Sequence, residues 1–207
     1  MKNSYFKISL LLLVCFLSFN GKTLTKTGYD IGDEVSDFQL KNVDGKMVSL
    51  SDFKTSKGVI LIFDCNTCPY SKAYNDRIIS LDKKYSSKGF PVIAINSNDP
   101  QISPGDSFNE MVEHAKKNNY SFPYLVDETQ SVAKIFGATN TPHVYVLVKS
   151  NKGFKVAYLG GIDNNVRDAS AANKKYVEDA VDDLLSNQAV RTTKTKAIGC
   201  GIKWKNS

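Results

Sequence analysis

The chain has 207 residues, of which 42% are hydrophobic and 23% are charged. This composition is typical of a globular protein, and the length suits one domain that buries a substantial core. The net charge of +6 comes from the two ends, because Lys2 and Lys7 lie near the start and five basic residues without an acid lie between Gln188 and Ser207. The body of the chain is therefore close to neutral, which excludes a nucleic-acid-binding surface.

The first residues have the pattern of a secretory signal. Lys2 and Lys7 precede an apolar run over 8–19, which is shorter than the roughly 20 residues that span a bilayer. We predict that 1–21 is a cleaved signal peptide and that the protein is exported, to the periplasm or the extracellular space. The alternative is an uncleaved signal that anchors the chain in the membrane. A lipid anchor on Cys15 is disfavoured because no small residue precedes it.

The rest of the chain divides into three parts. Residues 22–36 are polar and read as a leader, and 37–187 read as a single domain. The basic tail over 188–207 contains Ile202 and Trp204, which are too apolar for a free tail. We therefore expect the tail to dock on the domain.

In chain order, the hydrophobic periodicity predicts a hairpin over 37–50, strands over 59–63, 92–95, 122–126, 143–148 and 154–159, and helices over 70–85, 107–117, 128–136 and 170–185. Strands that alternate with helices indicate an α/β sheet covered on both faces. Cys65 and the loop over 96–106 then follow the carboxyl ends of two strands, where α/β sheets bind ligands. Asn96, Ser97 and Asn98 are candidates to line that edge, although loop capping explains them as well.

Two cysteines follow the apolar strand directly, in the order strand, Cys65-x-x-Cys68, amphipathic helix. We expect Cys65 at the helix N-terminus, where backbone N–H groups stabilise a thiolate and lower the thiol pKa from about 8.5 to about 3.5–7.5. Cys65 would attack a target disulfide, and Cys68 would resolve the mixed disulfide. The carboxylate of Asp64 acts in the opposite sense and would raise the pKa of Cys65 if it lies close.

Two other roles for the dithiol are an inert disulfide and half of a zinc site. Zinc needs four ligands, and Cys200, His114 and His143 are the only other residues that suit it. Cys-x-x-Cys within a βαβ pattern favours redox chemistry instead. We therefore predict neither a metal nor a cofactor.

The segments FDCNTCPYSKAYNDR and TPHVYVL, with the closing helix, resemble the thioredoxin superfamily. The segments VIAINSNDP, FPYLVDETQ and AIGCGIKWK are similar to a peroxiredoxin-like redoxin group within its AhpC/TSA and TlpA/ResA-like branch. The resemblance covers most of the chain from about residue 33. It implies a thioredoxin-like fold, with a central mixed β-sheet, helices on both faces, an N-terminal β-hairpin and an α/β insert.

The resemblance also implies residue roles. Cys65 would be the nucleophile and Cys68 the resolving thiol, and the two would form the redox-active disulfide. Pro142 would be a cis-proline facing them, with the Thr141 backbone exposed for pairing with an extended substrate; the alternative is a trans proline that begins an edge strand. Asp64 departs from the family by standing where thioredoxins carry a Trp. It could replace their buried acid, but we favour an exposed loop residue.

Two further residues, Cys200 and His143, have two interpretations each. Cys200 lies between Gly199 and Gly201, which permit close approach of the backbone to another surface. It is either a third redox thiol or, as we favour, a packed small residue. His143 is either a proton shuttle near the dithiol or, as we favour, a solvent-facing strand residue, and His114 is expected to be exposed.

The leading functional hypothesis is thiol–disulfide exchange with extracytoplasmic protein partners and an unidentified electron donor or acceptor. The direction, reduction or oxidation, is open. The runner-up is a thiol peroxidase: in the peroxiredoxin pattern P-x-x-x-T-x-x-C the peroxidatic position is Cys68, but Leu61 and Cys65 occupy the Pro and Thr positions. A third hypothesis is a non-catalytic interaction module that retained the fold. No nucleic acid is expected, and the membrane would be contacted only through an uncleaved signal.

Overall fold

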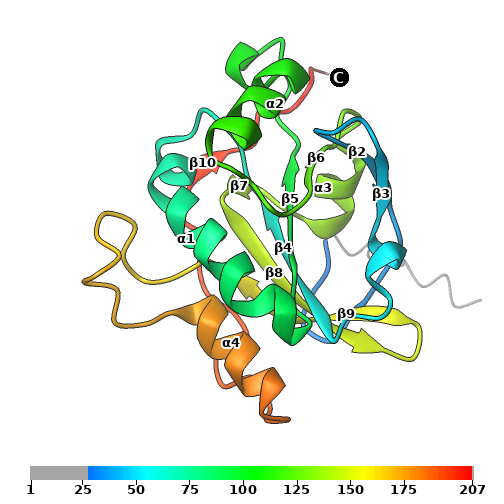
Figure 1. Ribbon diagram of the computed structural model, residues 1–207, viewed down its shortest axis with the longest axis vertical. Coiled ribbons are helices and arrows are strands. Elements are labelled where there is room, and N and C mark those ends of the chain that lie inside the picture. The colour runs from blue at the N-terminus through cyan, green and yellow to red at the C-terminus, as the bar shows by residue number, and fades with distance from the viewer. Residues whose placement is uncertain (1–27, 207) are drawn as a thin grey trace, which may run out of the picture.

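The computed structural model describes residues 28–206, so the predicted signal peptide, Cys15 and the first part of the leader, 22–27, lie outside the described residues. An eight-stranded sheet forms the centre of the molecule, in the order β1-β9-β8-β4-β5-β6-β2-β3 (Figure 1). A separate two-stranded ladder joins β10 to β7. The strands are β1 (Glu34–Val35), β2 (Gln39–Asn42), β3 (Met47–Ser49), β4 (Gly58–Phe63), β5 (Val92–Asn96), β6 (Tyr124–Val126), β7 (Asn140–Thr141), β8 (His143–Ser150), β9 (Gly153–Gly160) and β10 (Cys200–Gly201).

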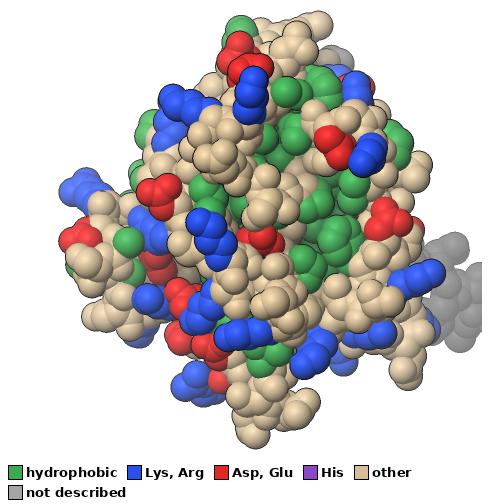
Figure 2. All heavy atoms as spheres, in the orientation of Figure 1, with side chains coloured by type: hydrophobic (Ala, Val, Ile, Leu, Met, Phe, Trp, Pro, Cys, Tyr) green, Lys and Arg blue, Asp and Glu red, His purple; other side chains and the backbone are tan. Residues whose placement is uncertain are grey.

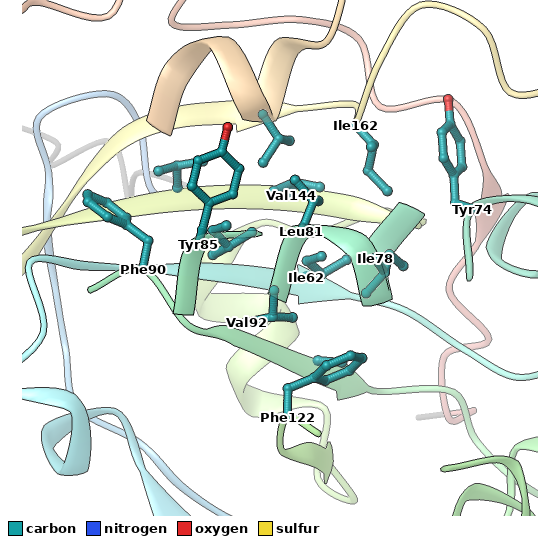
Figure 3. Close-up of a cluster of buried hydrophobic side chains, with 14 of the residues drawn as sticks. Ile62, Tyr74, Ile78, Leu81, Tyr85, Phe90, Val92, Phe122, Val144 and Ile162 are labelled. Carbon is teal, nitrogen blue, oxygen red and sulfur yellow. The ribbon is translucent and has the colours of Figure 1, made fainter. Parts of the chain in front are cut away.

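The central strand β4 is apolar on both faces because both faces are covered. Every residue of β4 is buried. It pairs in parallel with β5 and antiparallel with β8, so the sheet is mixed. Side chains on the two faces belong to two separate hydrophobic clusters, and Figure 3 shows Ile62, Ile78 and Val144 in one of them. The predicted strand and its burial on both faces are confirmed.

Helices cover both faces of the sheet, as predicted. The helices are α1 (Pro69–Tyr85), α2 (Phe108–Lys117), α3 (Ser131–Phe136) and α4 (Tyr176–Leu185), with short 3-10 turns η1 (Leu50–Phe53), η2 (Ser86–Lys88) and η3 (Pro104–Asp106). Buried side chains of α1, α2 and α4 join one cluster, and those of α3 join the other. The predicted hairpin is β2 paired with β3.

Helix α3 begins three residues later than predicted and β6 begins two residues later, and two larger differences separate the structure from the sequence-based expectation. Helix α4 begins at Tyr176, because polar side chains in the preceding segment bond locally to other groups: the Asp168 carboxylate accepts from the Ser170 N–H over 2.8 Å, and the Asn164 side chain accepts from the Lys174 N–H over 3.1 Å. Within the predicted leader, β1 pairs antiparallel with β9 and therefore extends the sheet. Helix α2 begins where expected, but its N-cap Ser107 makes no side-chain capping hydrogen bond.

The surface carries both signs of charge. On the face in Figure 2, Lys and Arg side chains are interspersed with Asp and Glu, and hydrophobic side chains gather between α1 and β3. Among residues 28–206, the structure contains no helix with the length and apolarity needed to cross a membrane.

The core packing predicts a large difference between two isoleucines. Ile78 of α1 is 0% exposed, whereas Ile135 of α3 is 53% exposed. Ile78→Ala should lower the free energy of unfolding by about 2–5 kcal/mol, because it leaves a cavity against the sheet. Ile135→Ala, the matched control, should change it by less than about 0.5 kcal/mol. Urea unfolding of both variants measures this, and equal losses would contradict the packing described.

Candidate active site

The dithiol lies in the loop between β4 and α1, at the carboxyl edge of the sheet. Helix α1 begins at Pro69 with Cys68 as its N-cap residue, because proline is well accommodated in the first turn. Cys65 therefore lies three residues before the N-cap residue. Cys65 is thus outside the helix, contrary to the expected position, but the backbone N–H of the N-cap residue Cys68 does hydrogen-bond to it, as expected for a cysteine at a helix N-terminus.

The two residues between the cysteines are held by one carboxylate. Asp106, from η3, accepts hydrogen bonds from the Asn66 N–H and the Thr67 hydroxyl, both over 2.7 Å. It also accepts from Asn98 over 2.9 Å and from Ser103 over 2.6 Å. We call these five residues the Asp106 cluster. The loop after β5 thus fixes the conformation of the dithiol loop after β4.

Sequence reasoning did not single out Asp106, although it placed its loop at this edge. The available signal was an acid in a Pro- and Gly-containing loop that follows a buried strand. Burial works against ionisation of Asp106, but the hydrogen bonds from Ser103, Asn98 and Thr67 outweigh it and lower the pKa of the carboxyl group below its ordinary value. The cluster is therefore anionic at neutral pH.

Thr141 contacts both cysteine sulfurs. The peptide bond between Thr141 and Pro142 is cis, the isomer that the resemblance implied. The Thr141 hydroxyl lies 3.1 Å from the Cys65 Sγ, and its carbonyl oxygen lies 3.2 Å from the Cys68 Sγ. The Ser71 hydroxyl approaches Cys65 to 3.8 Å. The structure thus brings together the four residues that the sequence assigned to the site.

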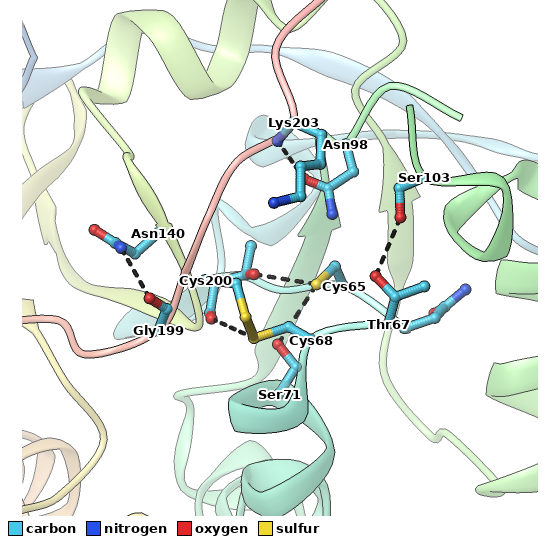
Figure 4. Close-up of a disulfide and its surroundings, with 12 residues drawn as sticks. Cys65, Thr67, Cys68, Ser71, Asn98, Ser103, Asn140, Gly199, Cys200 and Lys203 are labelled. Atoms are coloured by element: carbon cyan, nitrogen blue, oxygen red, sulfur yellow. Dashed lines mark hydrogen bonds between the residues drawn. A yellow bond between two sulfur atoms is a disulfide. The ribbon is translucent and has the colours of Figure 1, made fainter. Parts of the chain in front are cut away.

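The disulfide in the structure joins Cys68 to Cys200, with the two Cα atoms 5.9 Å apart (Figure 4). Cys65 is a free, buried thiol. The resemblance implied a Cys65–Cys68 pair, so the structure shows a different partner for Cys68. Cys200 is not the unpaired packed residue that we favoured, because strand pairing of the tail places it opposite Thr141.

The electrostatics of Cys65 are also different from the expectation. Burial raises the pKa of the Cys65 thiol, the carboxylates of Asp64 and Asp106 raise it further, and the hydrogen bond with Thr141 opposes them. In this arrangement the thiol pKa is raised above its ordinary value, not lowered. The largest cause is burial, and the two nearby acids add to it; together they outweigh the hydrogen bonds from Thr141 and from the backbone N–H of Cys68, the N-cap of α1.

Asp64 is buried, so its assignment as an exposed loop residue is wrong. Burial raises the pKa of its carboxyl group from 3.8 to about 6. Among the described residues, nothing donates a hydrogen bond to its Oδ1 atom. Asp64, the residue directly after β4, is thus a buried acid adjacent in the chain to the free thiol of Cys65.

Both histidines differ from the expectation. His143 is buried, its ring lies 4.8 Å from that of Tyr145, and burial lowers its pKa to about 4. His114 is half-buried, with its Nε2 atom 3.0 Å from the Tyr120 hydroxyl. Within residues 28–206, no group of three or more His, Cys, Asp or Glu side chains is arranged to hold a metal ion.

Comparisons with known proteins agree with this architecture. The AhpC/TSA family model matches residues 31–158. The thiol-disulfide oxidoreductase ResA of Bacillus thuringiensis subsp. konkukian is 26% identical over 154 residues, covering 71% of this chain and 83% of that protein. An uncharacterized conserved protein from Geobacillus kaustophilus is 36% identical, with a TM-score of 0.80, covering 86% of this chain and 94% of that chain.

A putative thiol:disulfide interchange protein DsbE from Chlorobium tepidum shares the fold, with a TM-score of 0.52 and 24% identity, covering 64% of this chain and 85% of that chain. The mixed sheet, the Cys-x-x-Cys loop and the facing cis-proline define a thioredoxin-fold redox protein. The chain belongs to the AhpC/TSA family. The predicted fold class and the predicted activity, thiol–disulfide oxidoreductase, are confirmed.

The pKa of Asp64 predicts a pH dependence of stability. Because its pKa is about 6 in the folded chain and 3.8 without burial, the folded state binds this proton more tightly. The contribution is complete below about pH 4 and is lost as the pH rises through about 6, at a cost of about 3 kcal/mol. Asp64→Asn should remove this fall in the free energy of unfolding. Urea unfolding between pH 4 and pH 7 measures it, and identical slopes in wild type and variant would contradict the assignment.

Proposed function

We propose that the chain exchanges disulfides with proteins outside the cytoplasm, with Cys65 as the attacking thiol and Cys68 as the resolving thiol. The observation that carries the proposal is the contact of both sulfurs with Thr141, beside the cis-proline. A client disulfide held against Thr141 would be within reach of both cysteines. Attack by the Cys65 thiolate gives a mixed disulfide, and attack by Cys68 releases the reduced client and leaves a Cys65–Cys68 disulfide.

The proton of Cys65 needs an acceptor, because only the thiolate attacks. Asp64 adjoins Cys65 in the chain, and a base is most effective when its pKa lies near the operating pH. The pKa of about 6 for Asp64 meets that condition. We assign Asp64 as the acceptor that takes the proton of Cys65 during attack.

The backbone of β7 is the proposed contact for the client. An extended peptide can add to an exposed strand through main-chain hydrogen bonds, which do not depend on its sequence. Asn140 and Thr141 form a short strand directly before Pro142, which pairs with β10 in this structure and would offer its backbone to a client when β10 leaves. This supports protein or peptide partners, with a second dithiol or disulfide protein as the electron donor or acceptor.

The N-terminal sequence supports the extracytoplasmic location. Residues 1–21 combine Lys2 and Lys7 with a short apolar run. Expression of the full chain in a bacterial host should give a periplasmic or secreted form that lacks this segment. Subcellular fractionation with mass spectrometry of the N-terminus measures this. Leu11→Arg, which interrupts the apolar run, should keep the protein in the cytoplasm, and export of that variant would contradict the assignment.

The residue roles predict distinct variants in an insulin-reduction assay. Cys65→Ser should lower turnover by at least about 10²-fold, because the attacking sulfur is gone. Cys68→Ser should also stop turnover, but it should accumulate a mixed disulfide between Cys65 and the client, visible on non-reducing gels. Peroxide consumption that depends on Cys68 and not on Cys65 would instead support a peroxidase. Inactivity in both assays, with no trapped complex, would overturn the proposed function.

A further inference from the structure

The end of the chain lies against the dithiol as a short strand. In β10, Cys200 pairs with Thr141 in antiparallel register, and beyond it the Ile202 N–H donates to the Thr139 carbonyl over 3.0 Å. Ile202 is buried. The tail therefore uses the backbone groups beside the cis-proline that the proposed function assigns to a client.

Further contacts anchor the tail beyond this strand. The Lys203 N–H donates to the Asn98 side chain over 2.9 Å, and the Lys203 carbonyl accepts from the Asp99 N–H and from the Gln130 amide, each over 2.8 Å. The Lys205 N–H donates to the same Gln130 amide over 2.8 Å. Asn98 belongs to the Asp106 cluster, so its amide side chain connects the tail to Asp106 and, through Asp106, to the dithiol loop. We call residues 198–205 the docked tail.

We propose that Cys200 is a third catalytic thiol and that the docked tail is an intramolecular substrate strand, which closes the site by forming the Cys68–Cys200 disulfide. This inference rests on the proposed function, because the Cys65–Cys68 disulfide that Cys200 attacks is the product of client reduction. Figure 4 shows the arrangement, with Cys65 beside the Cys68–Cys200 bond and Gly199 next to Cys200.

The exchange conserves atoms and electrons. The Cys200 thiolate attacks the Cys68 sulfur of a Cys65–Cys68 disulfide, so the bond between Cys65 and Cys68 breaks and the bond between Cys68 and Cys200 forms. The electron pair leaves on the Cys65 sulfur, which takes up the proton that Cys200 released. Neither an oxidant nor a reductant is consumed. In the reverse step the Cys65 thiolate attacks Cys68 and frees Cys200.

The chain thus carries one disulfide in two alternative positions. In the closed form, which the structure shows, Cys65 is reduced and covered and β7 is occupied. In the open form, the Cys65–Cys68 disulfide and β7 are accessible to a partner. Because tail and client need the same backbone groups, closure and client binding exclude each other. The apparent affinity for the client is therefore the intrinsic affinity multiplied by the fraction of molecules that are open.

Two glycines of the tail provide a matched test. A Cβ atom at Gly199 would lie 2.1 Å from the Thr141 carbonyl oxygen and 2.6 Å from its carbon, which are backbone atoms. A Cβ atom at Gly201 would meet nothing nearer than the Thr139 oxygen, at 4.0 Å. Gly199→Ala should therefore lift the docked tail, whereas Gly201→Ala makes the same chemical change in the same segment without a clash.

The first experiment locates the free thiol. The full chain is oxidised with glutathione disulfide, quenched in acid to stop exchange, labelled with N-ethylmaleimide under denaturing conditions and mapped by mass spectrometry. Among Cys65, Cys68 and Cys200, wild type and Gly201→Ala should carry the label mainly on Cys65, and Gly199→Ala mainly on Cys200. Ile202→Ser, which removes a buried tail anchor, should follow Gly199→Ala. Label on Cys200 in wild type, or equal maps for the two glycine variants, would overturn the proposal.

The second experiment measures competition with a client. In insulin reduction with excess dithiothreitol the three thiols are reduced, so the docked tail competes with the client through its backbone pairing with β7 alone. Gly199→Ala should then lower KM by about tenfold relative to Gly201→Ala, with kcat little changed, if the tail is docked in about nine-tenths of the reduced wild-type molecules. If the tail only stabilises the fold, Gly199→Ala should have a lower melting temperature and an unchanged KM. That result would overturn the proposal. If wild type does not reduce insulin at all, the proposed function fails, while the disulfide map still decides the exchange.

Discussion

The site depends on the charged hydrogen bonds that the Asp106 carboxylate accepts. Asp106 follows β5, and the groups that donate to it include Asn66 and Thr67 between the two cysteines, which follow β4. Because these two strands are parallel neighbours, their carboxyl ends meet at one edge, and a side chain from one loop can hold the other. Hydrogen bonds to a charged acceptor are stronger than neutral ones, so the dithiol loop is held firmly although it lies outside regular structure.

The Asp106 carboxylate also raises the pKa of Cys65 and so lowers the fraction of reactive thiolate. Burial, Asp64 and Asp106 all raise the pKa of Cys65, so the thiol is protonated at neutral pH in the form that the structure shows. The hydroxyl of Thr141 acts in the opposite direction through a hydrogen bond. In the proposed mechanism Cys65 is therefore held in an unreactive state, and its activation requires a proton acceptor and removal of the segment that covers it. We propose Asp64 as the acceptor and the docked tail as the covering segment.

The docked tail connects the chemistry of the site to access by a partner. Its strand pairing with β7 and its disulfide to Cys68 occupy the two features that a disulfide client would engage. A segment that binds through its backbone can be displaced by another extended chain that makes the same bonds. The closed arrangement is therefore compatible with a redox enzyme whose site opens only when its own tail leaves.

The sequence by itself determined the β4–dithiol–α1 unit, because apolar periodicity and Cys-x-x-Cys spacing are local signals, and its resemblance to thioredoxins implied the cis-proline. Only the tertiary structure decided the environment of each reactive group. Asp64 was expected to be an exposed loop acid, yet it is buried, and Asp106 was not singled out, yet it organises the dithiol loop. Cys200 is separated from Cys68 by 132 residues, so no local pattern could pair them. Burial, charge proximity and disulfide partners arise from contacts between distant segments, and those contacts are set by the packed fold.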